Sequence, residues 1–198
     1  SNKEISSLIA NNMDIPSILK NASMDWDGGY TMAGLFGHGD AFVLRDPNGI
    51  RPAFWYDDEE VLVVTSERPV IQTAFNVKWE KVNELKPGHA LIVKKDFDVK
   101  EVEINSPSNL QKCSFERIYF SRGTDKDIYK ERLILGSLVT PQVLEAVNFD
   151  LKRTVFSFIP NTAEMSYYGM IKATEDYLSG VKKKKIQELD QNDHKYQE

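Results

Sequence analysis

The stretch DAFVLRDPNGIRPAFWY, residues 40–56, contains two short apolar runs separated by turn-forming residues. The runs at 40–46 and 53–56 are rich in aliphatic and aromatic side chains, as β-strands are. Between them, Pro47 presets one backbone φ angle, Asn48 tolerates the next conformation, and Gly49 accepts a positive φ. The stretch therefore predicts two strands that reverse at residues 46–49, within a mainly antiparallel sheet.

Similar runs flank this stretch on both sides. We predict strands at 30–37, 61–67 and 89–95, an acidic solvated tip at 57–60, and a type II turn at 86–89 with glycine at its third position. Thr65 or Ser66 is predicted to cap a helix from Pro69 to Phe75, because proline is tolerated in a first turn. Apolar residues at helical spacing predict two short helices at the start of the chain.

The pattern changes after SPSNLQK, residues 106–112, a polar and turn-rich segment that we take as a boundary between two units. Beyond it, SFERIYFSR at 114–122 fits a strand, 128–147 has helical periodicity, and 154–159 is an apolar run typical of a buried parallel strand. A helix carrying Met165 and Leu178 follows, and then a polar tail. This order predicts the start of an α/β unit without the strands that would complete its sheet.

Composition limits the partners of the chain. Its 198 residues are 41% apolar, enough for a core, and its formal net charge of -5 argues against sequence-independent binding of nucleic acid. One cysteine, Cys113, permits no internal disulfide, which favours a reducing compartment. No run approaches the roughly 20 apolar residues of a membrane span. We therefore expect a cytoplasmic protein that binds neither nucleic acid nor membranes.

Several residues of types that can carry chemistry have a simpler interpretation. Cys113 lacks a sequence context that would activate a thiol, and the three histidines are too scattered to form a zinc site. Lysines 182–185 are followed by acidic residues and predict an exposed helix.

The segment FSFIPNTAE, residues 156–164, is more informative. A predicted strand ends at Ile159 and Pro160, so that Asn161 and Thr162 stand at the start of the next helix, where open α/β sheets bind ligands. The alternative is that one of these two residues simply caps the helix.

The run GHGDAFVLRDPNGIRP, residues 37–52, resembles the signature of the glutaminase domain in amidophosphoribosyltransferases. The likeness continues through VVTSERPVIQTA, ELKPGHALIV and CSFERIYFSRGTDKDIYKER, and FSFIPNTAE falls where that family begins its phosphoribosyl-diphosphate site. In all, the resemblance covers about residues 28–180.

This resemblance implies a fold and a division into domains. It implies an α+β chain in which residues 1–112 are the C-terminal part of a class II glutamine amidotransferase domain, with the αββα fold of Ntn hydrolases. Residues 113–198 would be a linker and the first strand and helix of a type I phosphoribosyltransferase domain, followed by a charged tail.

The resemblance also implies an activity, that of a glycosyltransferase of purine biosynthesis that moves ammonia from glutamine to phosphoribosyl diphosphate. The family's nucleophilic N-terminal cysteine has no counterpart here, so we expect no catalytic residue in this chain and no activity from it alone. Asn161 and Thr162 match substrate-binding positions, and Thr162 also matches a magnesium ligand. The acidic loop that would complete the magnesium site is missing, and Asn161 departs from the acidic residue frequent at its position.

Cys113 falls where some members of the family supply a ligand to an iron–sulfur cluster. Because such a cluster takes about four thiolates, this chain cannot hold one alone, and the resemblance allows a cluster only in a longer parent protein. The resemblance also implies a homo-oligomer. Two alternatives stay open: another class II glutamine amidotransferase, against which FSFIPNTAE argues, and a degenerate, non-enzymatic homologue that serves as a binding or scaffolding module.

Overall fold

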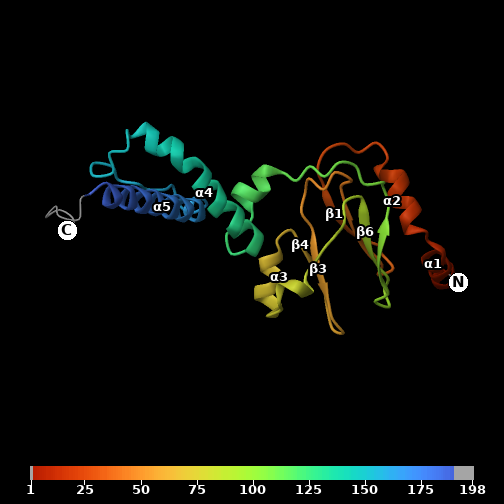
Figure 1. The fold of residues 1–198 in the computed structure, drawn as a ribbon. Helices are drawn as coiled ribbons and strands as arrows, with labels where there is room; N and C mark the ends of the chain where they lie inside the picture. The colour runs from red at the N-terminus through yellow and green to blue at the C-terminus, as the bar shows by residue number, and fades with distance from the viewer. Residues whose placement is uncertain (1, 190–198) are drawn as a thin grey trace. The chain divides into compact units, whose positions relative to one another are not determined.

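The computed structural model describes residues 2–189, apart from the side chain of Lys3, and divides the chain into two compact units between Phe120 and Ser121. Unit 1 combines helices with antiparallel sheets, and unit 2 consists mainly of two long helices (Figure 1). The predicted α+β class is therefore confirmed at this coarse level. The predicted polar tail lies partly outside the described residues.

Unit 1 begins with two helices, as predicted: α1, Asn2–Asn12, and α2, Ile15–Ser23. The carboxylate of Asp14 caps α2, since it accepts hydrogen bonds from the Ser17 backbone N–H at 3.2 Å and the Ser17 hydroxyl at 2.6 Å. Pro16 lies in the first turn, where its missing N–H costs nothing. These local signals explain why the helix begins where it does.

Two antiparallel sheets form the body of unit 1. The larger sheet has the strand order β1-β2-β6-β7, with β1 at Thr31–Leu35, β2 at Ala41–Arg45, β6 at His89–Val93 and β7 at Val99–Glu103. The smaller sheet has the order β4-β3-β5, with β3 at Phe54–Asp57, β4 at Leu62–Thr65 and β5 at Asn83–Glu84. The five predicted strands of this region are confirmed. Strands β5 and β7 were not predicted, because one is only two residues long and the other, VKEVE, is mostly charged.

Three clusters of buried side chains define the layers of unit 1. The first lies between α2 and the larger sheet, around Leu44. The second lies between the two sheets, where Leu91 faces Trp55. The third lies between the smaller sheet and α3, Arg68–Phe75, around Ile71. The layer order is therefore helix, sheet, sheet, helix (Figure 1).

Both predicted glycine turns are confirmed. The Gly49 N–H bonds the carbonyl of Asp46 at 3.2 Å, and Gly49 has a φ of +63°. Gly88 has a φ of +72°, and a Cβ there would lie 2.1 Å from the carbonyl oxygen of Asn105. Glycine is required at this second turn by backbone conformation and by the close approach of the chain.

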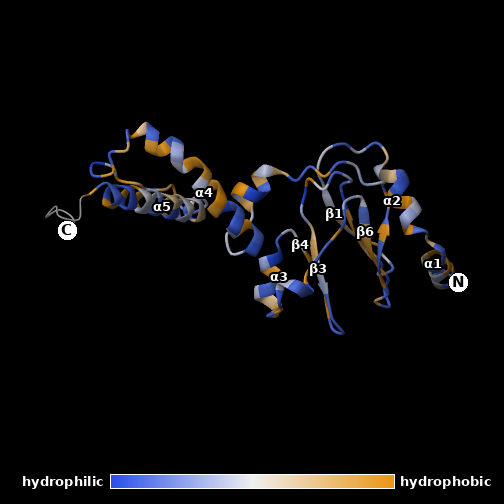
Figure 2. Ribbon diagram, in the orientation of Figure 1, coloured by the Kyte–Doolittle hydropathy of each residue, from blue (hydrophilic) through white to orange (hydrophobic). Residues whose placement is uncertain are grey.

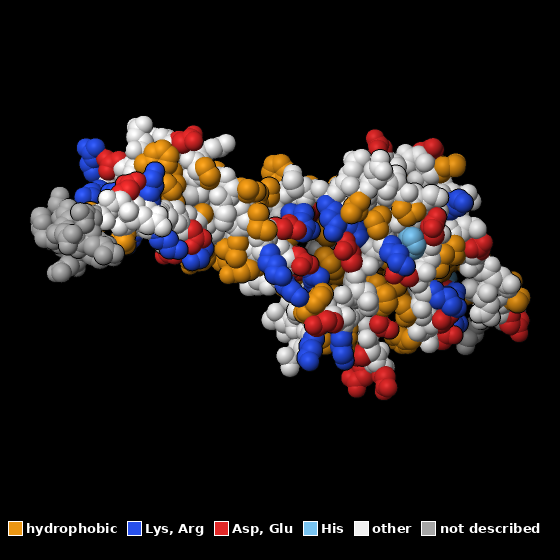
Figure 3. Space-filling view, viewed as in Figure 1, with side chains coloured by type: hydrophobic (Ala, Val, Ile, Leu, Met, Phe, Trp, Pro, Cys, Tyr) orange, Lys and Arg blue, Asp and Glu red, His pale blue; other side chains and the backbone are white. Residues whose placement is uncertain are grey.

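The acidic tip predicted at 57–60 is also confirmed. All four residues are exposed at the end of the β3–β4 hairpin, which is hydrophilic in Figure 2 and shows a group of acidic side chains in Figure 3. The carboxylate of Asp58 accepts hydrogen bonds from the N–H groups of Glu60 and Val61, each at 2.9 Å. The acidic residue at this position thus shapes the turn.

Two local predictions for unit 1 are wrong. The residue at the N-cap of α3 is Glu67, and the Thr65 hydroxyl donates to the Glu67 carbonyl at 2.9 Å. Residues 114–122 form no strand. They contain a single π-helical turn, η2, Glu116–Phe120, because the backbone pairing of this segment ends at Cys113 and the chain then bonds to itself. A short 3-10 helix, η1, lies at Trp79–Lys81.

Unit 2 contains the two predicted long helices, α4 at Lys126–Ala146 and α5 at Glu164–Glu188, the second of which includes the exposed lysines 182–185. The helices touch at two glycines. A Cβ on Gly136 would lie 1.8 Å from the Ser166 carbonyl oxygen, and a Cβ on Gly169 would lie 2.0 Å from that of Leu133. The absence of side chains at these two positions therefore sets the helix–helix distance.

The buried parallel strand predicted at 154–159 is absent from the described part of the chain. The segment has no regular secondary structure and pairs with no strand, and Val155 is 92% exposed and Ile159 84% exposed. A strand needs a neighbouring strand, and the described residues of unit 2 provide none. Among the described residues, no helix has the length and apolar character needed to cross a membrane.

Candidate functional site

The loop after β2 is organised by a buried carboxylate. Asp46 is fully buried, and its two oxygens accept hydrogen bonds from the backbone N–H groups of Asn48 at 3.1 Å, Ile50 at 2.9 Å and Arg51 at 3.0 Å. Three such bonds hold the loop in one conformation, because a buried carboxylate must be satisfied by donors. The RDPNGIRP stretch, residues 45–52, is thus a rigid loop, which we call the RDPNGIRP loop.

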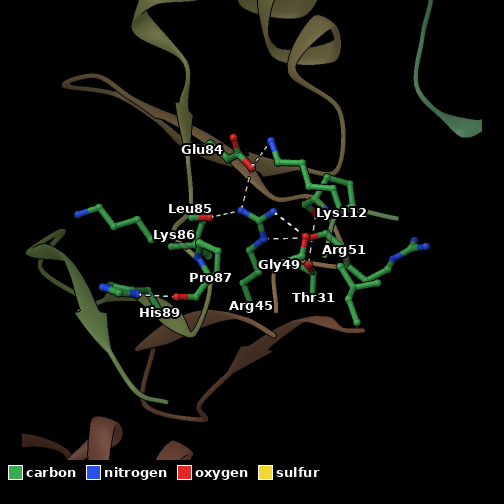
Figure 4. A network of polar contacts seen from close by, with 12 residues as sticks. Thr31, Arg45, Gly49, Arg51, Glu84, Leu85, Lys86, Pro87, His89 and Lys112 are labelled. Carbon is green, nitrogen blue, oxygen red and sulfur yellow. Dashed lines mark hydrogen bonds and ion pairs between the residues drawn. The ribbon is translucent and has the colours of Figure 1, made fainter. Parts of the chain in front are cut away.

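Arg45, the first residue of this loop, connects the rest of the loop to Glu84 in β5 and to Leu85 directly after it (Figure 4). Its Nε donates to the Arg51 carbonyl at 2.7 Å, and its Nη2 donates to the Gly49 carbonyl at 3.3 Å. Its Nη1 bonds Glu84 at 3.0 Å and also the carbonyl of Leu85. Every nitrogen of this buried guanidinium donates to the protein itself, so Arg45 is a structural residue and not a ligand for substrate.

The segment that follows β7 lies along the same loop. The N–H groups of Ser108 and Gln111 bond the carbonyls of Pro47 at 3.0 Å and Asn48 at 2.8 Å. The Cys113 N–H bonds the carbonyl of Ile50 at 3.3 Å. The polar stretch predicted as a boundary is therefore docked on unit 1, which extends to Phe120.

Cys113 is partly buried at the end of this docked segment. Among the described residues no three histidine, cysteine, aspartate or glutamate side chains group so as to hold a metal ion. The role of Cys113 as an iron–sulfur ligand, which the resemblance suggested, stays a prediction.

His38 and Lys94 converge on a second buried carboxylate, that of Asp40. His38 Nε2 lies 3.0 Å from Asp40 Oδ2, Lys94 pairs with the same oxygen, and the Lys95 N–H bonds Oδ1 at 3.0 Å. Burial disfavours the charged form, but the hydrogen bonds from Lys94 and His38 outweigh it and lower the pKa of Asp40 to about 2. The cluster joins the β1–β2 hairpin to the end of β6.

Asn161 and Thr162, the predicted substrate-binding residues, lie in the turn that precedes α5. Asn161 is exposed and Thr162 is partly buried. The prediction that one of them caps the helix is wrong, since Ala163 occupies the N-cap position and no side-chain cap bond is present. The cap is made by backbone instead, with the Glu164 N–H bonding the Asn161 carbonyl at 3.3 Å. Neither predicted side chain is therefore used to cap the helix.

The turn rests on aromatic contacts. The rings of Phe158 and Tyr167 lie 5.1 Å apart, and the Tyr167 hydroxyl donates to the carbonyl of Phe156 at 3.2 Å. Glu164, in the first turn of α5, accepts a hydrogen bond from the Tyr168 hydroxyl at 3.1 Å. Asn161 and Thr162 therefore lie on a supported turn, and their role in binding substrate stays a prediction.

No protein-family model matches the sequence. Curated relatives do match it. The amidophosphoribosyltransferase of Lachancea kluyveri is 33% identical over 165 residues, which cover 77% of this chain and 32% of that protein. The amidophosphoribosyltransferase of Saccharomyces cerevisiae is 32% identical over 147 residues, which cover 68% of this chain and 28% of that protein. The chain spans about a third of the length of these relatives.

Two solved structures share the fold. One is a glutamine phosphoribosylpyrophosphate amidotransferase from B. subtilis in complex with ADP and GMP, with a TM-score of 0.61 and 23% identity, covering 88% of this chain and 38% of that chain. The other, described as the allosteric regulatory enzyme of purine biosynthesis, has a TM-score of 0.58 and 23% identity, covering 87% and 36%. The chain is therefore a homologue of the amidophosphoribosyltransferases that corresponds to about a third of their length.

Proposed function

We propose that the chain is a portion of a glutamine-dependent amidophosphoribosyltransferase. Unit 1 would contribute to a glutaminase domain of the αββα, Ntn-hydrolase type, and unit 2 would begin a type I phosphoribosyltransferase domain. The whole protein would move ammonia from glutamine to C1 of phosphoribosyl diphosphate and release pyrophosphate, the first step of purine nucleotide synthesis.

One observation carries this proposal. The match at 33% identity covers 77% of the 198 residues, about 152, which is more than the 120 residues of unit 1, so the sequence similarity extends into unit 2. Another class II glutamine amidotransferase would be expected to resemble unit 1 alone. The extent of the match therefore favours an amidophosphoribosyltransferase over that alternative.

The chain by itself is proposed to lack glutaminase activity. An N-terminal nucleophile is activated by its own free amine, but Cys113 is an internal residue whose backbone nitrogen is an amide that bonds the Ile50 carbonyl. An amide nitrogen is not a base. Arg45 and Asp46, the charged pair of the family-like motif, are both buried and occupied by internal hydrogen bonds. Unit 1 would then have a structural role and supply no catalytic residue.

Unit 2 would supply half of the phosphate-binding site. The amides at the start of α5 and the helix dipole favour an anion beside Asn161 and Thr162. The carboxylate of Glu164 would repel such an anion, so a cation that bridges the two would favour binding. The described residues do not form a magnesium site by themselves, since Mg²⁺ prefers about six oxygens and Thr162 offers one. Thr162 would at most add one oxygen to an ion carried by the diphosphate.

Calorimetric titration of the chain with phosphoribosyl diphosphate and magnesium tests this half-site. Thr162→Ala should weaken binding about tenfold, the value of one charge-assisted contact. Thr174→Ala is the matched control, because it removes a hydroxyl that bonds only the Met170 carbonyl within α5. Absence of heat at millimolar ligand, or an equal loss in both variants, would overturn the assignment of Asn161 and Thr162.

The proposed inactivity has its own test. Incubation of the chain with glutamine should release no ammonia above the buffer control, and release that depends on Cys113 would contradict the proposal.

In the whole protein we further propose a cytoplasmic homo-oligomer. A cluster at Cys113 would require about three further thiolates from elsewhere.

A further inference from the structure

The turn η2 is inverted relative to an ordinary surface helix. Of its two charged residues, Glu116 is only 8% exposed and Arg117 is partly buried, whereas Ile118, Tyr119 and Phe120 are 51%, 62% and 57% exposed. Surface helices usually bury the apolar side chains and leave the charged ones in water. Burial of apolar surface therefore does not explain the orientation of this turn.

An ion pair does explain it. Glu116 Oε1 pairs with Arg51 Nη1, so the buried carboxylate has a charged donor. A buried carboxylate without a partner would be strongly disfavoured, and Arg51 removes that penalty. The pair connects the RDPNGIRP loop to a residue 65 positions further along the chain.

The backbone of Arg51 is itself held from both sides. Its N–H donates to Asp46 Oδ2 at 3.0 Å, and its carbonyl accepts from Arg45 Nε at 2.7 Å. Both of those partners are fully buried. Arg51 thus presents its guanidinium from a rigid base, and a change in its side chain leaves these backbone bonds in place.

The Arg51–Glu116 pair also continues a series of contacts. Upstream, the N–H groups of Gln111 and Cys113 bond the carbonyls of Asn48 and Ile50 on the same loop. The ion pair lies three residues beyond Cys113, at the start of η2 and shortly before unit 2 begins. It is therefore placed to decide whether the end of unit 1 is docked or released.

We propose that Arg51 is a positioning residue that latches residues 113–120 onto unit 1 and determines which face of η2 points outward. With the latch closed, Glu116 points inward and the three apolar side chains are exposed. With it open, Glu116 is hydrated and the segment leaves the RDPNGIRP loop. This conformational role is independent of the proposed enzymatic function and concerns the chain alone.

Cys113 is a built-in reporter of the latch, because it is the single cysteine in the sequence. Its rate of reaction with a thiol reagent should rise about tenfold in Arg51→Gln, since local opening controls access to a docked segment. The exchanged pair Arg51→Glu with Glu116→Arg should return the rate to near that of the unmodified chain. Lys112→Gln is the control, because Lys112 is next to Cys113 in the sequence and its ion pair, with Glu84 on β5, is long at 3.8 Å.

Hydrogen exchange of the β2 and β6 amides separates release of the latch from general unfolding. These amides should be equally protected in all variants. Unchanged labelling of Cys113 in Arg51→Gln, or failure of the exchanged pair to restore the rate, would overturn the proposal. It would also be overturned if the β2 and β6 amides lost protection together with Cys113, since the effect would then be global.

Discussion

Arg45 Nη1 lies 3.0 Å from Glu84 Oε1, and the two side chains have very different environments: that of Arg45 is 2% exposed and that of Glu84 is 40% exposed. The Arg45 guanidinium also donates hydrogen bonds to three carbonyls, whereas the Glu84 carboxylate is partly exposed to water. The two ends of the pair should therefore contribute unequally to stability.

Arg45→Met should destabilise unit 1 by about 3–5 kcal/mol, because it leaves the carbonyls of Gly49, Arg51 and Leu85 without their donor. Glu84→Gln should cost less than about 1 kcal/mol, since the amide keeps an acceptor and the site is partly solvated. Urea unfolding followed by tryptophan fluorescence reports unit 1, because Trp26, Trp55 and Trp79 all lie there. Equal effects of the two substitutions would contradict this account.

Asp46→Asn should lower the free energy of unfolding of unit 1 by about 2–4 kcal/mol. The amide has only one acceptor oxygen, so its NH₂ group would face backbone donors that now bond a carboxylate. The same fluorescence measurement applies. Asp57→Asn, at the exposed hairpin tip, is the matched control and should change the free energy by no more than about 0.5 kcal/mol.

Asp40 should make unit 1 sensitive to acid. Its pKa in the folded protein, about 2, is below the ordinary value of 3.8, so the ionised group stabilises the fold above about pH 4. That contribution is lost as the pH falls from about 4 towards 2. A pH titration of the urea midpoint should show this loss, and Asp40→Asn should lack it. Asp98→Asn, which alters an exposed pair with Lys100, should keep the acid transition of the unmodified chain.

The contact between α4 and α5 should tolerate no side chain at its two glycines. Gly136→Ala and Gly169→Ala should each destabilise unit 2 by about 1–3 kcal/mol, because the new methyl group would overlap a backbone carbonyl of the facing helix. Gly180→Ala, on the same helix α5 with open space around it, should instead stabilise by about 0.5–1 kcal/mol. Thermal unfolding followed by helical circular dichroism measures all three. A gain of stability in all three variants would indicate that helix propensity, and not packing, is being measured.

The local structure around Asn161 and Thr162 was predicted in part. The position of Asn161 and Thr162 before a helix followed from the short sequence around Pro160, because proline ends an extended segment and helical periodicity begins directly afterwards. The prediction that one of their side chains caps the helix was wrong, since Ala163 takes the N-cap position and no side chain caps the helix. The positions of Arg51 and Glu116 in one ion pair had no local signal, because 65 residues separate them.

The sequence by itself determined the features that depend on neighbouring residues. Gly49 and Gly88 specify turns because few other residues adopt their positive φ angles, and Asp14 with Pro16 specifies the start of α2. Tertiary structure decided the features that need a distant partner. Residues 154–159 carry the pattern of a strand but are unpaired, because hydrogen bonds between strands require a second strand at the right distance. Glu116 points inward for the corresponding reason, since the energy of a buried charge depends on the partner that the fold supplies.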